Sequence, residues 1–314
     1  MMAIRELAYA SHEEWLNIRA KYIGGSDASA VIGMNPWMSR YSLWAEKTGR
    51  VPPFEGNLRT EAGAYLEEFV AQKFTEATGK KVRRKNRTLI NDQYPWACAN
   101  LDRTIVGENA FLECKTTNSH PVMRTIRGSE EFPEVYYAQV VHYLAVSGMK
   151  KAYLAVLIDC SELRIFELER DEDEIAALMD AEREFWELVT TNTAPAPDGT
   201  ESTKETISTL YPESDGSTVD LVPFEATLRE YASLTAQIKA LTELRDEKSN
   251  IIREYMKEAE RGESAAFRVS YASSVRKTFD AKRFAEDHAG EDLSGYYKTT
   301  NTRVFKVTEK GGDK

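Results

Sequence analysis

Three places in the chain have an acidic residue followed two positions later by a lysine. A carboxylate and a lysine so placed can hold a hard divalent cation and orient the water that attacks a phosphodiester. The pairs are Glu113 and Lys115, Asp246 and Lys248, and Asp280 and Lys282. The first pair also has Asp102 eleven residues upstream, at the end of a predicted strand. The second pair falls on a predicted helix, where residues two apart face different directions, and the third has no identifiable acidic partner. The first pair is therefore the predicted metal site.

A predicted hairpin between residues 96 and 116 brings Asp102 and Glu113 to the same end of two neighbouring strands. Because side chains alternate along a strand, Glu113 and Lys115 share one face while Cys114 points to the core. Two such carboxylates suit Mg²⁺, which keeps waters and phosphate oxygens as its other ligands. Lys115 then orients the attacking water or neutralises charge on the phosphate. A structural interpretation, charge pairing between strands on a solvated face, stays open at this point.

The elements that must position these residues indicate an α/β protein. Apolar spacing predicts helices over residues 58–78, 133–147 and 172–190. Strand-like runs at 82–90, 96–105 and 110–116 are expected to form a small meander, and 152–158 a buried strand beside 163–169. Ser11 and Ser39 are predicted helix caps, and Ser26 or Asp27 is expected to cap the helix after a Gly-Gly turn.

Composition divides the chain into three parts. Residues 1–195 hold the predicted catalytic elements. Residues 196–222 are rich in Thr, Pro, Gly, Ser and acids, which is typical of a linker or long loop. Residues 223–314 begin with apolar residues at three- and four-residue steps and end in alternating segments. This last part is predicted to be one long amphipathic helix, a coiled-coil arm or hairpin partner, followed by a β-like tail.

Charge and apolar content limit the classes of protein. The net charge is −10, which argues mildly against a nucleic-acid partner. Six cations nevertheless occur in eight positions: Lys80, Lys81, Arg83, Arg84, Lys85 and Arg87. This run fits either a strand that follows phosphates or a solvated basic strand. No apolar run is long enough for a membrane span and the N-terminus does not look like a secretory signal, so we expect a cytoplasmic protein.

Several short stretches match one nuclease family in the expected order over about residues 15–190. They are RAKYIGGSDASAVIG, LWAEKTG, GAYLEEFV, ANLDRT, LECKT and YYAQVVHYLAV. Together they resemble the YqaJ-type viral recombinases, relatives of phage lambda exonuclease in the PD-(D/E)-x-K superfamily. Leu101 stands where the superfamily name has proline, which leaves Asp102 in place. The resemblance implies a restriction-endonuclease-like core, a central mixed β-sheet flanked by helices, with the C-terminal helical arm and small β-like tail added.

The resemblance also implies a role for particular residues. Asp102, Glu113 and the main-chain carbonyl of Cys114 would bind the metal, and Lys115 would assist the attacking water. Mg²⁺ is the expected ion, with Mn²⁺ as a substitute. Glu67 matches a helix carboxylate that helps a second metal or its water.

Further matches lie outside the acidic pair. Gln139 matches a helix glutamine close to the attacking water. Arg19 and Ser26 match residues that bind the 5′-terminal phosphate, which suits a guanidinium and a hydroxyl at a helix start. Trp37 either stacks on the terminal base pair or packs in the core, and core packing is favoured. His142 is expected to be a satisfied packing residue.

A Mg²⁺-dependent 5′-to-3′ exonuclease on linear double-stranded DNA is the function that the resemblance implies. It would leave 3′ single strands for recombination by strand annealing. DNA ends, an annealing protein of the RecT or beta type and a homotrimeric ring are the implied partners. Two alternatives remain: an endonuclease or single-strand-specific nuclease with the same metal site, and a non-catalytic DNA- or protein-binding accessory protein.

Overall fold

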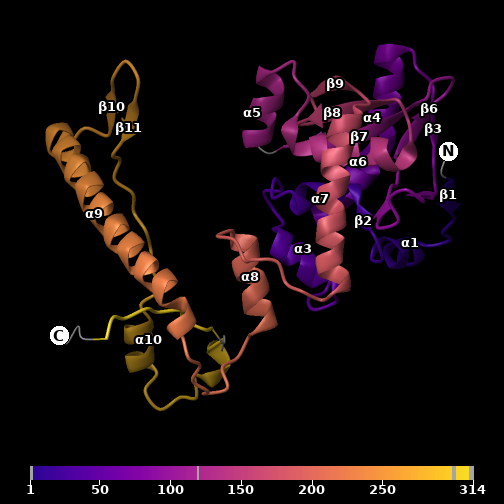
Figure 1. Ribbon diagram of the computed structural model, residues 1–314. Helices are drawn as coiled ribbons and strands as arrows, with labels where there is room; N and C mark the ends of the chain where they lie inside the picture. The colour runs from indigo at the N-terminus through magenta and orange to yellow at the C-terminus, as the bar shows by residue number, and fades with distance from the viewer. Residues whose placement is uncertain (1–2, 119, 299–301, 311–314) are drawn as a thin grey trace. The chain divides into compact units, whose positions relative to one another are not determined.

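The computed structural model describes residues 3–118, 120–298 and 302–310. The chain forms two compact units, Met1–Tyr211 and Pro212–Lys314 (Figure 1). The first unit contains the predicted metal site. Within the described residues, no helix is both long and apolar enough to cross a membrane.

A five-stranded mixed sheet forms the centre of the first unit. Its strand order is β3 (Val82–Arg84), β6 (Arg103–Ile105), β7 (Ala110–Thr117), β8 (Lys151–Ile158) and β9 (Glu162–Glu169). Strands β7 and β8 pair in parallel and the other neighbours pair antiparallel. The parallel pair requires a crossover, which α5 (His120–Gly128) and α6 (Glu134–Ser147) supply. The predicted mixed sheet flanked by helices is thus confirmed.

Helices cover both faces of this sheet. On one face, α4 (Leu58–Thr78) packs Val70 and Phe74 against Leu112 and Cys114 of β7. On the opposite face, α5 covers β8 and β9, while α6 packs against Phe111 of β7. Alternation along β7 therefore turns Glu113 toward the side of the sheet that carries α6. Strand β8 is buried along nearly its whole length, as its apolar sequence predicts.

The predicted three-stranded meander is present as β3, β6 and β7, which pair antiparallel in succession, but the predicted strands are too long, because the runs at 82–90 and 96–105 are each broken in two. Strand β4 (Thr88–Asn91) pairs with β1 (Ile4–Leu7), and β5 (Ala97–Cys98) pairs with β2 (Ile23–Gly24). Of the four strands in these two runs, only β3 and β6 belong to the central sheet. The reason is that N-terminal strands, which the sequence did not indicate, supply the partners of β4 and β5.

Helices α1 (His12–Arg19), α2 (Gly25–Val31) and α3 (Arg40–Lys47) precede this sheet. Ser11 and Ser39 cap α1 and α3 as predicted. The cap of α2 is Gly24, and Asp27 accepts a hydrogen bond from the Gly24 amide at 3.0 Å. The prediction that Ser26 or Asp27 is the cap was therefore wrong by two or three positions.

Residues 196–222 are less of a linker than their composition predicts. Helix α7 (Glu172–Thr190) is followed by α8 (Glu201–Leu210), which lies inside this range. Thr203 donates a hydrogen bond to Ser39 at 2.7 Å, and Thr206 donates one to Ser42 at 2.7 Å. Because these buried hydroxyls satisfy one another, a Thr-rich segment docks on α3 instead of remaining a loop.

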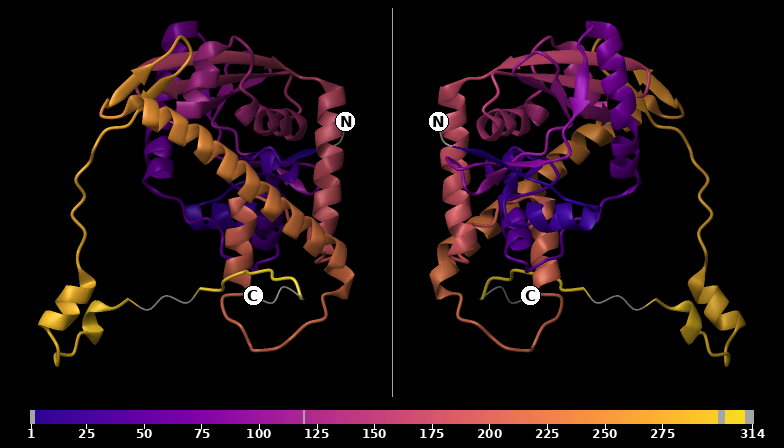
Figure 2. Two further views of the ribbon diagram at one scale, coloured as in Figure 1. Left: turned by 90° about the vertical axis from the view of Figure 1, so that its left-hand side faces the viewer. Right: turned by 90° about the vertical axis from the view of Figure 1, so that its right-hand side faces the viewer.

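The second unit is built on one long helix, α9 (Glu225–Met256), as predicted (Figure 2). A hairpin of β10 (Arg261–Glu263) and β11 (Arg268–Ser270) follows it, and α10 (Ala281–Asp287) comes later. The predicted strand-like segment at 302–307 is not a strand, although Phe305 packs edge-on against Tyr231 of α9. The apolar stripe of α9 is exposed: Tyr231, Leu234, Ile238, Leu241 and Leu244 are 44–65% accessible.

A buried polar pair joins α6 to α7. Nδ1 of His142 lies 2.7 Å from Oε1 of Glu182, and its Nε2 lies 2.9 Å from the Cys98 carbonyl. Both ring nitrogens therefore face acceptors, which suits the protonated ring. Burial alone lowers the pKa of His142, but the Glu182 carboxylate raises it above the ordinary value of 6.5. His142 is thus a satisfied packing residue, as predicted.

We predict that this pair makes stability depend on pH. A raised pKa in the folded state means that the folded chain binds the proton more tightly than the unfolded chain does. The contribution is complete below about pH 6.5 and is lost as pH rises through the raised pKa. His142→Gln, which does not titrate, should lower the free energy of unfolding by about 2 kcal/mol at pH 5.5. Urea titrations from pH 5.5 to 9 should show this difference shrinking, and a constant difference would contradict the prediction.

Candidate active site

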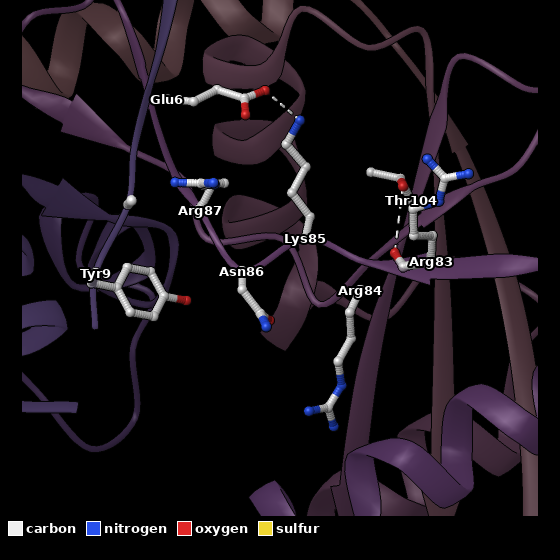
Figure 3. Close-up of a pocket in the computed structure, with 9 residues that line it drawn as sticks. Glu6, Tyr9, Arg83, Arg84, Lys85, Asn86, Arg87 and Thr104 are labelled. Carbon is white, nitrogen blue, oxygen red and sulfur yellow. Dashed lines mark hydrogen bonds and ion pairs between the residues drawn. The ribbon is translucent and has the colours of Figure 1, made fainter. Parts of the chain in front are cut away.

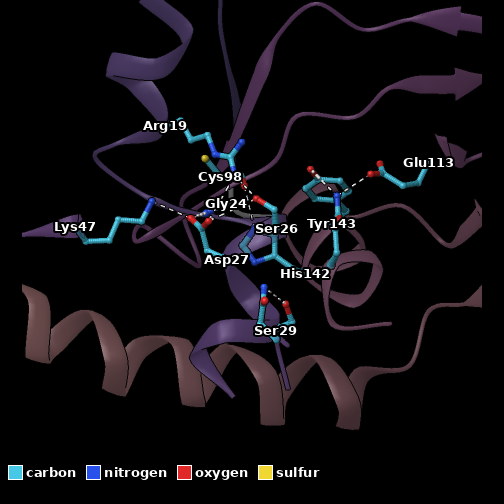
Figure 4. Close-up of polar contacts among 12 residues, drawn as sticks. Arg19, Gly24, Ser26, Asp27, Ser29, Lys47, Cys98, Glu113, His142 and Tyr143 are labelled. Carbon is cyan, nitrogen blue, oxygen red and sulfur yellow. Dashed lines mark hydrogen bonds and ion pairs between the residues drawn. The ribbon is translucent and has the colours of Figure 1, made fainter. Parts of the chain in front are cut away.

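A pocket of about 230 Å³ collects most of the predicted site residues. They come from separate elements: Arg19 from α1, Ser26 from α2, Asp102 from the turn before β6, Glu113 and Lys115 from β7, and Gln139 from α6. Two groups of predicted site residues thus line one cavity. One group is the carboxylates of Asp102 and Glu113, and the other is the Arg19 guanidinium with the Ser26 hydroxyl. Figure 4 shows the arrangement from Lys47 through Arg19 and Ser26 to Tyr143 and Glu113.

Glu113 is almost fully enclosed, with 2% of its surface accessible. Nζ of Lys115 lies 2.8 Å from Oε1 of Glu113, which confirms that the two side chains share a face of β7. Nε2 of Gln139 donates to the same oxygen at 2.6 Å. The other oxygen of Glu113, Oε2, is buried and has no hydrogen-bond partner among the described residues. An anionic oxygen left without a donor in this way is costly unless a cation satisfies it.

Asp102 approaches the same point from the neighbouring strand. Its Oδ2 accepts a hydrogen bond from the Cys114 amide at 2.8 Å. The pairing of Arg103 with Leu112 places Asp102 directly before β6, at the end of the hairpin that the sequence predicts. Because the amide and carbonyl of a strand residue point to the same edge, the Cys114 carbonyl faces the side on which Asp102 lies.

The charges at this point are unbalanced. Burial, then the carboxylates of Glu113 and Glu67, raise the pKa of Asp102 well above its ordinary value. Burial also raises the pKa of Glu113, and Lys115 opposes this shift. Within the pocket Lys115 thus faces two carboxylates, Asp102 and Glu113, and a bound cation would favour their ionised forms.

These residues fit a hard divalent cation. Two carboxylates and a carbonyl supply oxygen ligands on one side, and the orphaned Oε2 of Glu113 is the observation that asks for a cation. Within the described residues, no three His, Cys, Asp or Glu side chains gather at one point. The protein alone therefore offers an incomplete set of ligands. This is typical of sites for ions such as Mg²⁺, which keep waters and phosphate oxygens as their other ligands.

Glu67 lies outside the pocket lining. It stands on α4, which packs on the opposite face of β7, and it forms an ion pair with the nearly buried Arg103. Arg103 also bonds Glu68 at 3.0 Å. Glu67 still acts electrostatically on Asp102 and Glu113. Arg103, which sequence reasoning missed, directly follows Asp102 and could have been found by its place on the same strand.

Arg19 and Ser26 meet at the other end of the pocket, where Arg19 donates to the Ser26 hydroxyl. Behind them, the buried Asp27 bonds Nζ of Lys47 at 2.8 Å and lies 3.5 Å from the Arg19 guanidinium. Burial opposes its charge, but Lys47 and Arg19 hold the pKa of Asp27 below its ordinary value. Asp27 and Lys47 thus fix the guanidinium in place.

Sequence reasoning missed other lining residues. Trp15 stands one turn before Arg19, whose guanidinium lies 5.3 Å from the indole centre. Tyr143 stands one turn after Gln139, whose amide donates to the Tyr143 hydroxyl at 3.3 Å. Each lies four residues from a predicted site residue on the same helix, so the helical repeat applied to Arg19 and Gln139 would have indicated both. The favoured core position of Trp37 was wrong, because 64% of its surface is accessible.

Close packing between α2 and α6 holds the two ends of the pocket together. A Cβ atom added to Gly25 would lie 2.8 Å from Cζ and 2.9 Å from Cδ1 of Tyr143. The ring therefore rests directly on the Gly25 backbone, and only glycine leaves room for it.

We predict that Gly25→Ala displaces the Tyr143 ring and destabilises the protein. Overpacking of this kind costs about 1–3 kcal/mol, or a drop in Tm of about 2–4 °C per kcal/mol for a domain of this size. Gly63→Ala is the matched control, since its added Cβ would lie at an ordinary 3.6 Å from Thr116 Oγ1. Thermal unfolding of both variants would test this, and equal Tm values would contradict the prediction.

Comparisons with known proteins give the family. Residues 14–150 match the model of the YqaJ-like viral recombinase domain. The chain is 38% identical over 307 residues to an uncharacterized protein YqaJ from Bacillus subtilis, covering 95% of each chain.

Solved structures give the fold. An alkaline exonuclease from Laribacter hongkongensis is similar with a TM-score of 0.50 and 20% identity, covering 63% of this chain and 100% of that one. The same enzyme in complex with dAMP gives a TM-score of 0.51 and 20% identity over 58% of this chain and 94% of that one. The fold of the matched part of the chain is therefore that of this alkaline exonuclease. On the strength of the identity along nearly its whole length, the chain belongs to the YqaJ-like viral recombinase domain family.

Proposed function

We propose that this protein is a metal-dependent exonuclease that hydrolyses one strand of linear double-stranded DNA from its 5′ end. The observation that carries the proposal is the buried, unpartnered Oε2 of Glu113 beside Asp102 and Lys115. The names of the structural neighbours, alkaline exonucleases, support the same chemistry. Mg²⁺ is the proposed ion, with Mn²⁺ as a substitute.

Asp102, Glu113 and the Cys114 carbonyl would hold the ion. When bound there, such an ion would polarise the scissile phosphate and make a bound water more acidic. Lys115 keeps its proton beside Glu113, because the two carboxylates raise its pKa although burial lowers it. It therefore supplies positive charge where the attacked phosphate gains negative charge.

Gln139 and Glu67 are proposed to support the metal site. Gln139 is fixed between Glu113 and Tyr143, so its amide orients the carboxylate and lies where an attacking water would pass. Glu67 is proposed to act on the same centre, as a ligand of a second ion or through its water. Its present ion pair with Arg103 would have to open for direct binding.

Arg19 and Ser26 are proposed to bind the 5′-terminal phosphate. A guanidinium held by Asp27, a hydroxyl and the first amides of α2 form a site for an anion inside the same pocket. This placement supports attack from a 5′ end and 3′ single strands as the product, for recombination by strand annealing.

Assembly and partners complete the proposal. We infer a homotrimer around DNA and an annealing protein of the RecT or beta type as partner, both acting in the cytoplasm. The exposed apolar stripe of α9 supports docking of that partner on the second unit. An endonuclease or single-strand-specific nuclease with the same metal site is the second candidate, and a non-catalytic accessory protein is the third.

Glu113→Gln and Lys115→Ala should each lower the rate of DNA hydrolysis by about 10²-fold or more, because the first weakens binding of the ion and the second removes positive charge at the phosphate. The other two acid-x-Lys pairs offer matched controls, and Lys248→Ala and Lys282→Ala should retain full activity. Release of acid-soluble nucleotides from duplex DNA in Mg²⁺ measures this. Turnover that survives both site variants would exclude the assignment, and absence of hydrolysis by the unaltered protein would favour the accessory role.

Linear and covalently closed circular duplexes should be treated differently. The protein in Mg²⁺ should degrade end-labelled linear DNA, spare the circle, and prefer a 5′-phosphate over a 5′-hydroxyl. Arg19→Ala should remove this preference, since it removes the cation that meets the phosphate. Arg183→Ala, on the outer side of α7, is the control. Cutting of the circle would support the endonuclease alternative.

A further inference from the structure

A second pocket lies beside the candidate active site. It is lined by residues 83–87 of the basic run, which have no role in the proposed function. Its volume is about 550 Å³. Strand β3, the turn to β4, and the chain after β1 line it, with Arg83, Arg84, Lys85, Asn86, Arg87 and Tyr9 as the principal members. Four cations there face one carboxylate, Glu6. A protein of net charge −10 has thus concentrated positive charge in one hollow.

Most of this charge is available to a ligand. Arg84 pairs with Glu68 at 3.1 Å and Lys85 with Glu6 at 2.6 Å, but both carboxylates are about half exposed or more. Ion pairs this exposed are weak and exchange readily for a phosphate. As far as the chain is described, Arg83 and Arg87 have no carboxylate within ion-pair distance. Ion pairs within the protein therefore leave these cations able to bind a phosphate.

The pocket also has groups that suit a base. Tyr9 is half-buried and extends toward Asn86, and Arg84 and Arg87 lie on either side of Asn86 (Figure 3). An aromatic ring beside a basic groove is the combination that binds single-stranded nucleic acid, because every base has a face that stacks. A duplex, whose bases are already stacked, could use the cations but not the ring.

The two pockets are neighbours. Arg84 pairs in register with Arg103, the residue after Asp102, so their backbones lie about one strand spacing, roughly 5 Å, apart, while the Arg84 side chain pairs with Glu68 on the α4 side of the sheet. Tyr9 lies beside Asn100, which lines the catalytic pocket, and its pKa is raised by burial and by Glu67. The two pockets therefore adjoin at Tyr9 and Asn100, and a strand that leaves the scissile phosphate past Asn100 would enter the second pocket at Tyr9.

We propose that this pocket binds a single-stranded segment of the DNA substrate next to the scissile phosphate. Arg84, Arg87 and Arg83 contact its phosphates, Tyr9 stacks on a base and Asn86 bonds a base edge. This assignment rests on the proposed nuclease function for its substrate, but the binding itself needs no turnover. The single strand arises either from the strand left after digestion or from the strand being cut.

The test measures DNA binding by the full chain in chelator, where no hydrolysis occurs. The probes are labelled duplexes of one length that are blunt, or carry a 3′ or a 5′ single-strand tail. Arg84→Ala combined with Arg87→Ala should weaken binding of a tailed duplex by about tenfold, with little change for the blunt one. The dependence of log K on log salt should fall by about 1.4, which is two single-strand phosphate contacts.

The control removes the same charge elsewhere. Arg183 is 51% exposed and pairs with Asp180, much as Arg84 is 54% exposed and pairs with Glu68. Arg127 likewise is exposed and pairs with Glu162. The double variant Arg127→Ala with Arg183→Ala should bind all three probes as the unaltered protein does.

A second pair of variants tests the ring. Tyr9→Phe should bind tailed DNA normally and Tyr9→Leu should bind it about fivefold more weakly, because only phenylalanine retains the stacking surface. Thermal unfolding of each variant verifies that it is folded. The tail whose binding is lost identifies which of the two strands occupies the pocket.

Two results would overturn the proposal. In one, the pocket variant binds tailed DNA as the control variant does. In the other, binding falls equally for blunt and tailed DNA, which would make the pocket a duplex contact. Failure of the nuclease proposal shows separately, as absence of hydrolysis in Mg²⁺ by a protein whose tail-dependent binding is intact.

Discussion

Like charges brought together away from water place the strongest demand on this protein. Asp102 directly precedes β6 and Glu113 lies on the neighbouring β7, with Glu67 on α4 acting on both, and Glu113 is almost fully enclosed. Their repulsion is opposed by Lys115, by the Gln139 amide and by the Cys114 amide, each of which comes from a rigid strand or helix. The parallel pairing of β7 with β8 and the packing of α4 and α6 on opposite faces hold these strands against that repulsion. The sheet is thus the frame that makes an unfavourable cluster possible.

Elements with a strong local signal could be predicted from the sequence. Helix α4 ends at Gly79 in the left-handed conformation, and α6 ends at Gly148 in the same way. Both C-terminal boundaries could therefore be predicted from the position of the glycine. The apolar run of β8 likewise indicated a strand covered on both faces. The partners of β4 and β5 were not legible, because they are short strands near the N-terminus with little alternation of their own. Helix α8 was hidden for a different reason, since its contacts with α3 are hydroxyl to hydroxyl and leave no apolar pattern.

The candidate site divides in the same way. The hairpin fixed the relation of Asp102, Glu113 and Lys115 through strand alternation alone. Gln139, Arg19 and Ser26 lie far away in the sequence, so only the family resemblance indicated them, and the fold brings them into one pocket. Glu67 shows the limit of that reasoning, because its helix lies on the other face of β7 and its carboxylate is bound to Arg103. The ion pair of Asp27 and Lys47 could not be predicted from the sequence. Its members lie on two different helices, α2 and α3, and no regular spacing in the sequence relates them.

The direct contact between Gly25 and the Tyr143 ring has a consequence for the product. With no side chain between them, the Tyr143 ring of α6 packs directly on the α2 backbone, so this contact sets the spacing between the proposed phosphate-binding end and the proposed hydrolytic end of the pocket. Such a fixed separation acts as a ruler. The length of DNA removed at each turnover would then be set by the protein backbone and not by the sequence of the DNA.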